Sequence, residues 1–372
     1  MVAAIRGKPA GPPMSDALAI QHRRNRSIRL WLFIVAAMVF GTILIGGVTR
    51  LTESGLSIVE WKPVTGTLPP LSERAWEAEF EKYKAIPQYQ ALNRGMSLAD
   101  FRVIYWWEWV HRQSARLTGL VFLLPFLWFL WRGALGLSLR IRLALILGLG
   151  AIQAAVGWWM VSSGLAERID VSQYRLALHL TLASVIFAAL VWTALRLVPR
   201  PSVEVPRRIR TSAVVLLGLV LVQIYLGALV AGLDAGLSYN TWPLMDGRFI
   251  PPWSGLFVME PWWVNLFENV LTVQFNHRMM AYVLFFAAVA HAIDAARTTR
   301  KQAFAGAHAL AAAITIQAII GIVTLIYQTP IAFAIVHQAM GMLVLTIAVV
   351  HAERLVRRRR SRAPTATADQ PA

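Results

Sequence analysis

The sequence predicts an all-α integral membrane protein with eight transmembrane helices, arranged as two pseudo-symmetric four-helix bundles. Three observations support this fold class. Hydrophobic residues make up 57% of the 372 residues and charged residues only 15%, which leaves too little polar surface for a soluble domain of this length. The apolar residues gather in long runs. The second half of the chain also repeats motifs of the first.

Eight apolar runs are long enough to cross a bilayer, whose hydrocarbon core of about 30 Å needs roughly 20 helical residues. The first run follows a polar and basic segment and is itself long enough to span, so we expect it to remain as the first helix. The runs lie near residues 29–48, 108–131, 143–162, 175–195, 211–232, 272–292, 304–326 and 331–353.

The net charge of +17 lies mainly on the two tails and on the loops after the second, fourth and sixth runs. This is the asymmetry of the positive-inside rule. It predicts that both termini are cytoplasmic and that the other loops lie outside. Because the charge reports membrane orientation, we expect lipid and no nucleic acid as a partner.

The repeat divides the chain into a first half at 29–198 and a second half at 211–353, joined by a basic linker at 199–210 that contains proline. Residues 1–28 are predicted to be a cytoplasmic tail and residues 354–372 a disordered basic tail. Because each half has an even number of helices, both enter the membrane in the same orientation, and equivalent sites are expected. The repeated residues are Gly46 and Gly227, Gln153 and Gln317, Gly157 and Gly321, His111-Arg112 and His277-Arg278, His179 and His337, and the acids Glu53 and Asp234, whose roles stay open.

Four of the eight histidines are expected at one depth, within the first turn or two of the outer ends of the even-numbered runs: His111, His179, His277 and His337. Each half thus offers two imidazoles, the arrangement that holds a planar heme by both axial positions. The alternative is that they only hydrogen-bond to neighbours. Zinc fits less well, because the chain has no cysteine and two histidines leave its usual four-ligand shell incomplete. The other histidines, His22, His291, His308 and His351, are expected at cytoplasmic ends or in a tail, solvated or at the membrane interface and without a special function.

Two further features adjoin these histidines. Arg112 and Arg278 each follow one of them and could pair with heme propionates through forked, charge-assisted bonds, or could extend to the interface instead. Glu108 lies three residues before His111, whereas the equivalent residue of the second half is Gln274. A carboxyl near the apolar region costs about 2.5–3.5 kcal/mol on insertion scales. Glu108 is therefore a candidate for chemistry, or for a hydrogen bond that orients an imidazole.

With these residues, the chain from about residue 29 to 353 resembles the heme A synthase family. The resemblance implies an enzyme that oxidises the C8 methyl of heme O to the formyl of heme A, the cofactor of terminal oxidases. Some members have a cysteine pair in an outer loop, which this chain lacks, so it is similar to the branch shared by proteobacteria and mitochondria. The motifs are Glu108-Trp109-Val110-His111-Arg112, Asn276-His277-Arg278, the single histidines His179 and His337, and the stretch from Gly46 to Ser57.

The resemblance also implies roles for individual residues. His111 and His179 would flank the substrate heme O, His277 and His337 would ligate a permanent heme b, and Glu108 would be the essential acid. A heme O synthase would supply the substrate, an electron donor that the sequence does not identify would take part, and terminal oxidase assembly would receive the product. The expected location is the bacterial inner membrane, with the heme sites toward the periplasm.

Two other classes of protein compete with this interpretation. A membrane electron carrier with two b hemes explains the four histidines, but it gives no reason for Glu108 and Gln274 to differ, and it would place hemes at opposite faces. A transporter with parallel repeats would be favoured by broken helices in mid-membrane, and the sequence has no convincing pair of these. The electron donor, the oxygen source and the oligomeric state are left open.

Overall fold

The computed structural model describes residues 14–62, 65–166, 168–201, 203–298 and 301–357. Within these ranges eight helices are long and apolar enough to cross a membrane, and there is no β-strand, so the predicted class is confirmed. Much of the two predicted tails lies outside the described residues. The eight helices are α1 (Met14–Leu51), α4 (Leu98–Trp131), α5 (Leu137–Ser162), α6 (Gln173–Arg196), α7 (Arg207–Gly232), α10 (Val270–Thr298), α11 (Lys301–Ile326) and α12 (Ile331–Val356).

Two of these helices begin ten or more residues earlier than predicted. α1 begins at Met14, because its polar and basic residues continue the helix before the apolar run. α4 begins at Leu98, where the side chain of Ser97 accepts a hydrogen bond from the N–H of Asp100 and caps the helix. His111 therefore lies roughly three and a half turns into α4. The prediction that it lies within the first two turns is wrong for this helix.

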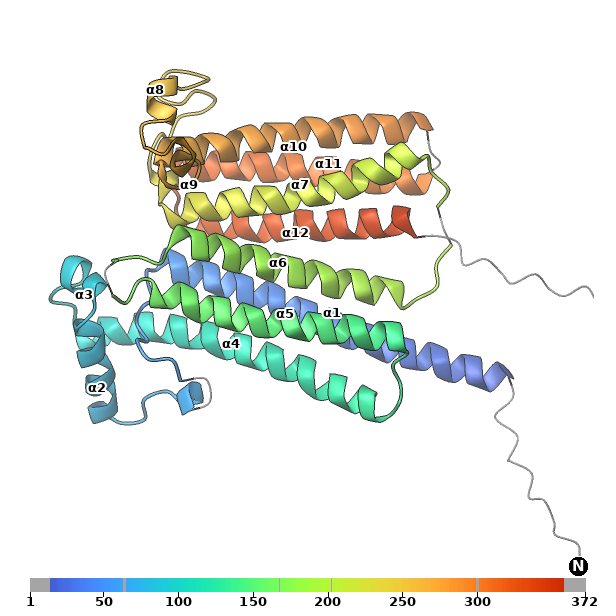
Figure 1. Cartoon of the computed structure of the whole chain (residues 1–372), viewed down its shortest axis with the longest axis horizontal. Helices are drawn as coiled ribbons and strands as arrows, with labels where there is room; N and C mark the ends of the chain where they lie inside the picture. The colour runs from blue at the N-terminus through green and yellow to red at the C-terminus, as the bar shows by residue number, and fades with distance from the viewer. Residues whose placement is uncertain (1–13, 63–64, 167, 202, 299–300, 358–372) are drawn as a thin grey trace, which may run out of the picture.

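The helices pack in two groups (Figure 1), and the helix–helix contacts within each group follow the same cyclic order. In the first group α1 packs against α4 and α6, and α5 packs against α6. In the second group α7 packs against α10 and α12, and α11 packs against both α10 and α12. The groups meet where α6 contacts α7 and α12, and where α1 contacts α12. This arrangement supports the predicted pair of four-helix bundles.

The two groups differ at one contact. α10 and α11 pack closely, whereas the equivalent helices α4 and α5 touch at only a few positions. The most apolar window of α5 is accordingly only 6% buried, compared with 22% for α11. The first group is therefore more open to the surrounding membrane between α4 and α5.

Short helices cover one end of the bundle, at the left in Figure 1. α2 (Glu73–Lys84) and α3 (Pro87–Leu92) lie between α1 and α4, and α8 (Trp253–Leu256) and α9 (Asn265–Glu268) lie between α7 and α10. Trp76 and Phe80 of α2 pack in one buried cluster with Phe101 and Tyr105 of α4. The early turns of α4 thus form a platform for this outer loop.

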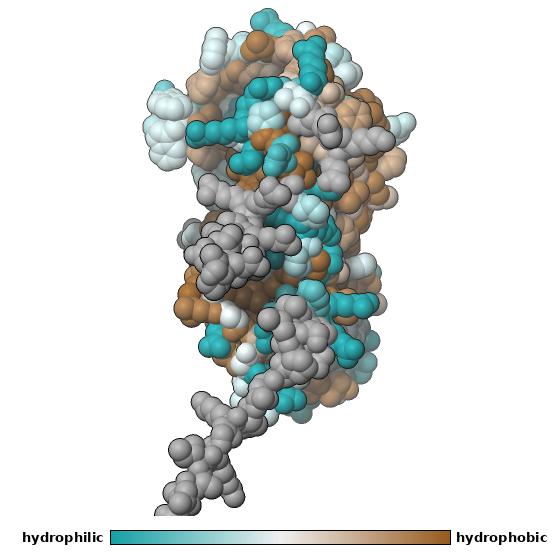
Figure 2. Space-filling model, turned by 90° about the vertical axis from the view of Figure 1, so that its right-hand side faces the viewer, coloured by the Kyte–Doolittle hydropathy of each residue, from teal (hydrophilic) through white to brown (hydrophobic). Residues whose placement is uncertain are grey.

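The opposite end of the molecule carries the first turns of α1 and the basic residues that begin α7 and end α12. Figure 2 shows this end, with hydrophilic side chains over the helix ends and apolar residues on the flanks. One apolar core made by residues of both groups lies between the two ends.

At the other end Arg50 of α1 pairs with Asp234, after α7, at 2.6 Å. Glu53 and Asp234 both adopt positive φ, of 53° and 49°, so these repeated acids occupy equivalent left-handed turns.

Candidate heme-binding sites

Each of the four predicted histidines lies against a glycine of a neighbouring helix. In the first half His111 of α4 faces Gly46 of α1, and His179 of α6 faces Gly157 of α5. A Cβ atom on Gly46 would lie 2.7 Å from His111 Cε1, and one on Gly157 would lie 2.8 Å from His179 Cε1. Both rings therefore occupy space that any residue other than glycine would fill.

The second half repeats this contact. A Cβ atom on Gly227 of α7 would lie 3.0 Å from His277 Cε1, and one on Gly321 of α11 would lie 2.7 Å from His337 Cε1. The structure thus places two of the predicted imidazoles in each half, each against a glycine of a neighbouring helix.

Three glutamines that were not predicted as site residues contact these imidazoles. Gln153 Nε2 lies 3.1 Å from His179 Nδ1, and Gln223 Nε2 lies 3.1 Å from His277 Nδ1. Gln317 Nε2 lies 3.5 Å from His337 Nε2. Each amide also donates to the backbone carbonyl of the same histidine, at 3.0–3.1 Å. A glutamine four residues before three of the four glycines was the available sequence signal, and the repeat alone could not assign its role.

Several buried polar atoms at these sites have no hydrogen-bond partner in the described structure, which fits the binding of a further group. The Oε1 atoms of Gln153, Gln223 and Gln317 and the Nδ1 atoms of His111 and His337 are buried without a hydrogen-bond partner among the described residues. Such groups are uncommon in native structures and call for a specific explanation. A heme iron held by imidazole Nε2 would leave a proton on Nδ1. No group of three or more potential metal-ligating residues occurs in the described part of the chain.

Glu108 lies on α4 and is buried, and it organises the loop that follows α1. Its Oε2 accepts hydrogen bonds from Ser57 Oγ and from the N–H of Ile58, both at 2.8 Å. Its Oε1 accepts from Arg112 Nη2 at 2.7 Å and Arg112 Nε at 3.0 Å. All of these partners are donors, so the site holds an ionised carboxylate. These bonds go to the loop and to Arg112, not to His111.

Gln274 occupies the equivalent place in the second half. It donates hydrogen bonds to the loop, whereas Glu108 accepts them. Its Nε2 donates to the carbonyls of Ala235 and Ser238 at 2.6 and 2.7 Å, and its Oε1 accepts from Arg278 at 2.9 Å. The loop after α1 therefore turns donors toward an acid, whereas the loop after α7 turns carbonyls toward an amide. The difference between Glu108 and Gln274 is thus matched by the surrounding backbone.

The two arginines beside the histidines also bind loop carbonyls. Arg112 Nη2 donates to Ile58 O at 2.8 Å, and Arg278 donates to Tyr239 O at 2.6 Å and to Thr241 O at 2.9 Å. These bonds hold each guanidinium at the outer edge of its site. Contact with heme propionates stays a prediction.

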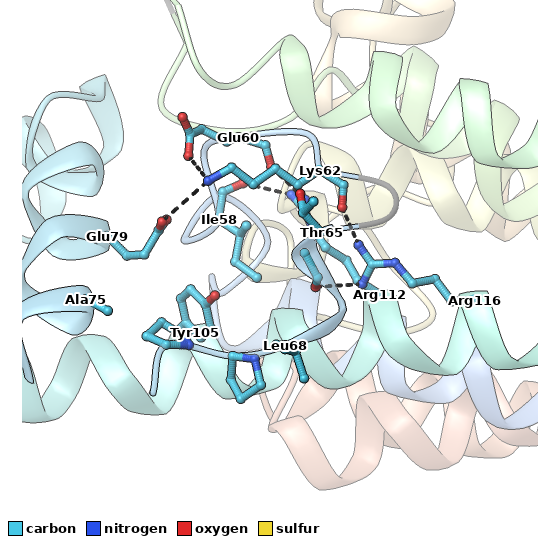
Figure 3. Close-up of a pocket in the computed structure, with 13 residues that line it drawn as sticks. Ile58, Glu60, Lys62, Thr65, Leu68, Ala75, Glu79, Tyr105, Arg112 and Arg116 are labelled. Atoms are coloured by element: carbon cyan, nitrogen blue, oxygen red, sulfur yellow. Dashed lines mark hydrogen bonds and ion pairs between the residues drawn. The ribbon is translucent and has the colours of Figure 1, made fainter. Parts of the chain in front are cut away.

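A small pocket of about 150 Å³ opens beside Arg112, beneath the loop between α1 and α4 (Figure 3). Lys62 lies between Glu60 and Glu79 in this pocket, with its Nζ 2.6 Å from Glu60 Oε2. Lys82 also binds Glu60, at 2.6 Å. Hydrogen bonds from Lys62 and Lys82 lower the pKa of the Glu60 carboxyl. The pocket is therefore polar and carries paired charges of both signs.

The expectation for the remaining histidines is wrong for two of them. His291 of α10 and His351 of α12 are both buried, and their Nε2 atoms lie 2.8 Å apart. Ser212 Oγ of α7 lies 2.7 Å from His291 Nδ1. This pair closes the end of the second half opposite the heme sites. His22 and His308, by contrast, are exposed as expected.

Comparison with known proteins assigns a family. The family model described as cytochrome oxidase assembly protein matches residues 29–349. A Rhodopseudomonas palustris protein named Heme A synthase is 59% identical over 333 residues, covering 90% of this chain and 92% of its own length. Proteins of the same name from Bradyrhizobium sp. and Bradyrhizobium diazoefficiens are 59% and 57% identical, over 91% and 90% of this chain and 93% and 92% of their own.

Proposed function

The chain belongs to the family of cytochrome oxidase assembly proteins, and from this premise we propose that it is a heme A synthase, which oxidises the C8 methyl of heme O to the formyl of heme A. One observation of the structure supports this most directly. Two pairs of imidazoles lie at equivalent places in two halves, each against a glycine that leaves room for the ring. Relatives named Heme A synthase at 56–59% identity support the same activity.

We assign the substrate heme O to the first half, between His111 and His179, and a permanent heme b to the second half, between His277 and His337. Two differences between the halves support this order. Only the first half has an ionisable side chain at the position shared by Glu108 and Gln274. The first half is also the more open one, because α4 and α5 make few contacts, and a hydrophobic substrate reaches such a site from the membrane.

When bound, heme supplies the redox chemistry of both sites, and the side chains of this chain supply position and proton transfer. Protons leave the substrate as its methyl is oxidised, and Glu108 is the candidate acceptor. Its carboxylate is held by Ser57, Ile58 and Arg112. Arg112 and Arg278, fixed to their loops, are positioned to pair with propionates. Whether Glu108 accepts a proton or only orders the loop is tested below.

We further propose that the protein lies in the bacterial inner membrane, with both termini in the cytoplasm and the heme sites toward the periplasm. The basic end shown in Figure 2 supports this orientation. The proposed partners are membrane lipid, a heme O synthase that supplies substrate, an electron donor of unidentified class and the terminal oxidase assembly that receives heme A. Membership of a cytochrome oxidase assembly family supports the last of these.

Pigment extraction from the purified protein tests this function. We expect heme b together with heme O or heme A, and heme A formation in cells that are supplied with heme O. Heme b alone, without conversion, would instead indicate an electron carrier with two b hemes. If the purified protein contains no heme, the proposed function is wrong.

A further inference from the structure

The contacts around the four imidazoles follow one pattern with a single departure. Three of the imidazoles have both a glycine and, four residues earlier on the same helix, a glutamine. The pairs are Gln153 with Gly157, Gln223 with Gly227, and Gln317 with Gly321. Residues four apart lie on one face of a helix, so glycine and glutamine meet the same imidazole.

His111 is the exception. The residue four positions before Gly46 is Thr42, whose short side chain faces Thr118 with 3.5 Å between the two hydroxyl oxygens. The ring of His111 meets the backbone carbonyl of Thr42, whereas its Nδ1 is buried without a partner among the described residues. The backbone carbonyl of His111 accepts instead from Ser114 Oγ of its own helix, at 2.8 Å. No side chain of a neighbouring helix thus holds this ring by a hydrogen bond in the described structure.

The glutamines are suited to hold a ligating imidazole. The amide nitrogens of Gln153 and Gln223 lie 3.1 Å from Nδ1 and 3.3–3.4 Å from Nε2 of their imidazoles, so each amide packs against its ring. The same nitrogens donate to the backbone carbonyls of His179 and His277 at 3.1 Å. Contacts of this kind orient a ligating ring, and the loss of such supporting residues typically lowers metal affinity roughly 10- to 100-fold.

We propose that Gln153, Gln223 and Gln317 are positioning residues that hold His179, His277 and His337, and that His111 is the weakly held axial ligand, the one that exchanges. This inference rests on the proposed heme sites. It makes the substrate site asymmetric, with His179 fixed and His111 replaceable. The cofactor site has two fixed ligands.

The experiment compares Thr42→Gln and Gln223→Thr in the full-length protein loaded with its hemes. Absorption and electron paramagnetic resonance spectra give the spin state of each heme, and carbon monoxide added to the reduced protein measures the fraction of iron with a replaceable ligand. In the unaltered protein we expect carbon monoxide to bind at the first half only. Thr42→Gln should reduce this fraction several-fold. Gln223→Thr should create a new fraction that binds carbon monoxide, and should lower heme b retention during dilution roughly 10- to 100-fold.

Thr42→Val is the matched control, because it keeps the shape of threonine and should leave the carbon monoxide fraction unchanged. If Thr42→Gln does not fold, Gln153→Thr provides a second variant in the first half. It should raise the fraction of iron in the first half that binds carbon monoxide. If heme binds but neither Gln223→Thr nor Gln153→Thr changes spin state or carbon monoxide binding, the positioning role is wrong while the proposed function stands. If the protein binds no heme, the proposed function itself fails.

Discussion

Replacing Glu108 by glutamine tests whether the first half requires an ionised carboxyl. The carboxylate accepts from Ser57 Oγ and Ile58 N on one oxygen and from Arg112 on the other. An amide has only one acceptor oxygen, so its NH₂ group must face either the Ile58 N–H or the Arg112 guanidinium. Donor then faces donor, because the loop after α1 offers none of the carbonyls that serve Gln274 in the second half.

The magnitude follows from burial. The Glu108 side chain is 3% exposed and that of Arg112 is 19% exposed, and breaking a buried pair by removing one partner costs about 3–5 kcal/mol. Because Arg112 keeps its bonds to the carbonyls of Ile58 and Glu60, we expect a loss near the lower value, about 3 kcal/mol. The assay combines unfolding of the purified protein in detergent with heme chromatography from cells that are supplied with heme O. We expect lower stability, no heme A, and heme b retained.

Ser57→Ala is the control for Glu108→Gln. It removes one donor to the same carboxylate, worth about 1.5–3 kcal/mol for a bond to a charged group, and keeps the ionised acid. It should therefore lower stability and still allow heme A to form. Near-normal heme A formation in Glu108→Gln would refute the catalytic assignment and leave this residue a support for the loop. Unchanged stability in that variant would refute the argument from the buried pair.

Other perturbations give shorter tests. His277→Ala should remove heme b or convert it to a high-spin form, since one of two axial imidazoles is lost; a full low-spin complement would contradict the assignment. Gly321→Val should lower heme b content, measured after extraction, because its Cβ would lie 2.7 Å from His337 Cε1; an unaltered content would show that the ring is free to move. A reporter fused after residue 255 should score as external and one after residue 204 as internal. An internal score at 255 would overturn the proposed topology.

The eight membrane helices were predictable because each is a long apolar run, and run length is a local property of the sequence. The start of α4 was not predictable in this way. Its first turns are stabilised by the Ser97 cap and by packing of Phe101 and Tyr105 against α2, which is a contact between distant segments. The depth of His111 within its helix was misjudged for the same reason.

The candidate ligands could be selected from the repeat, whereas their supports could not. Gln153 and Gln317 stood out as repeated residues, but their contact with imidazoles depends on how α5 packs on α6 and α11 on α12. The pairing of His291 with His351 likewise needs α10 and α12 to meet at their inner ends. The position of His291 and His351 near helix ends therefore led to the wrong prediction that their side chains are solvated, whereas both are buried.

The two halves share the geometry that positions a ligand, but they differ in how open the site is. Both place imidazoles against glycines, so the backbone frame that positions a planar group is the same in each. What differs is lateral packing, tight between α10 and α11 and sparse between α4 and α5, and the side chain beside the first imidazole, Gln223 in one half and Thr42 in the other. Both differences act in the same direction, because an open flank admits a hydrophobic ligand and a weakly supported imidazole lets it leave. The half with an open flank and a weakly supported imidazole is suited to a substrate heme that is exchanged. The half with neither feature is suited to a heme that remains bound.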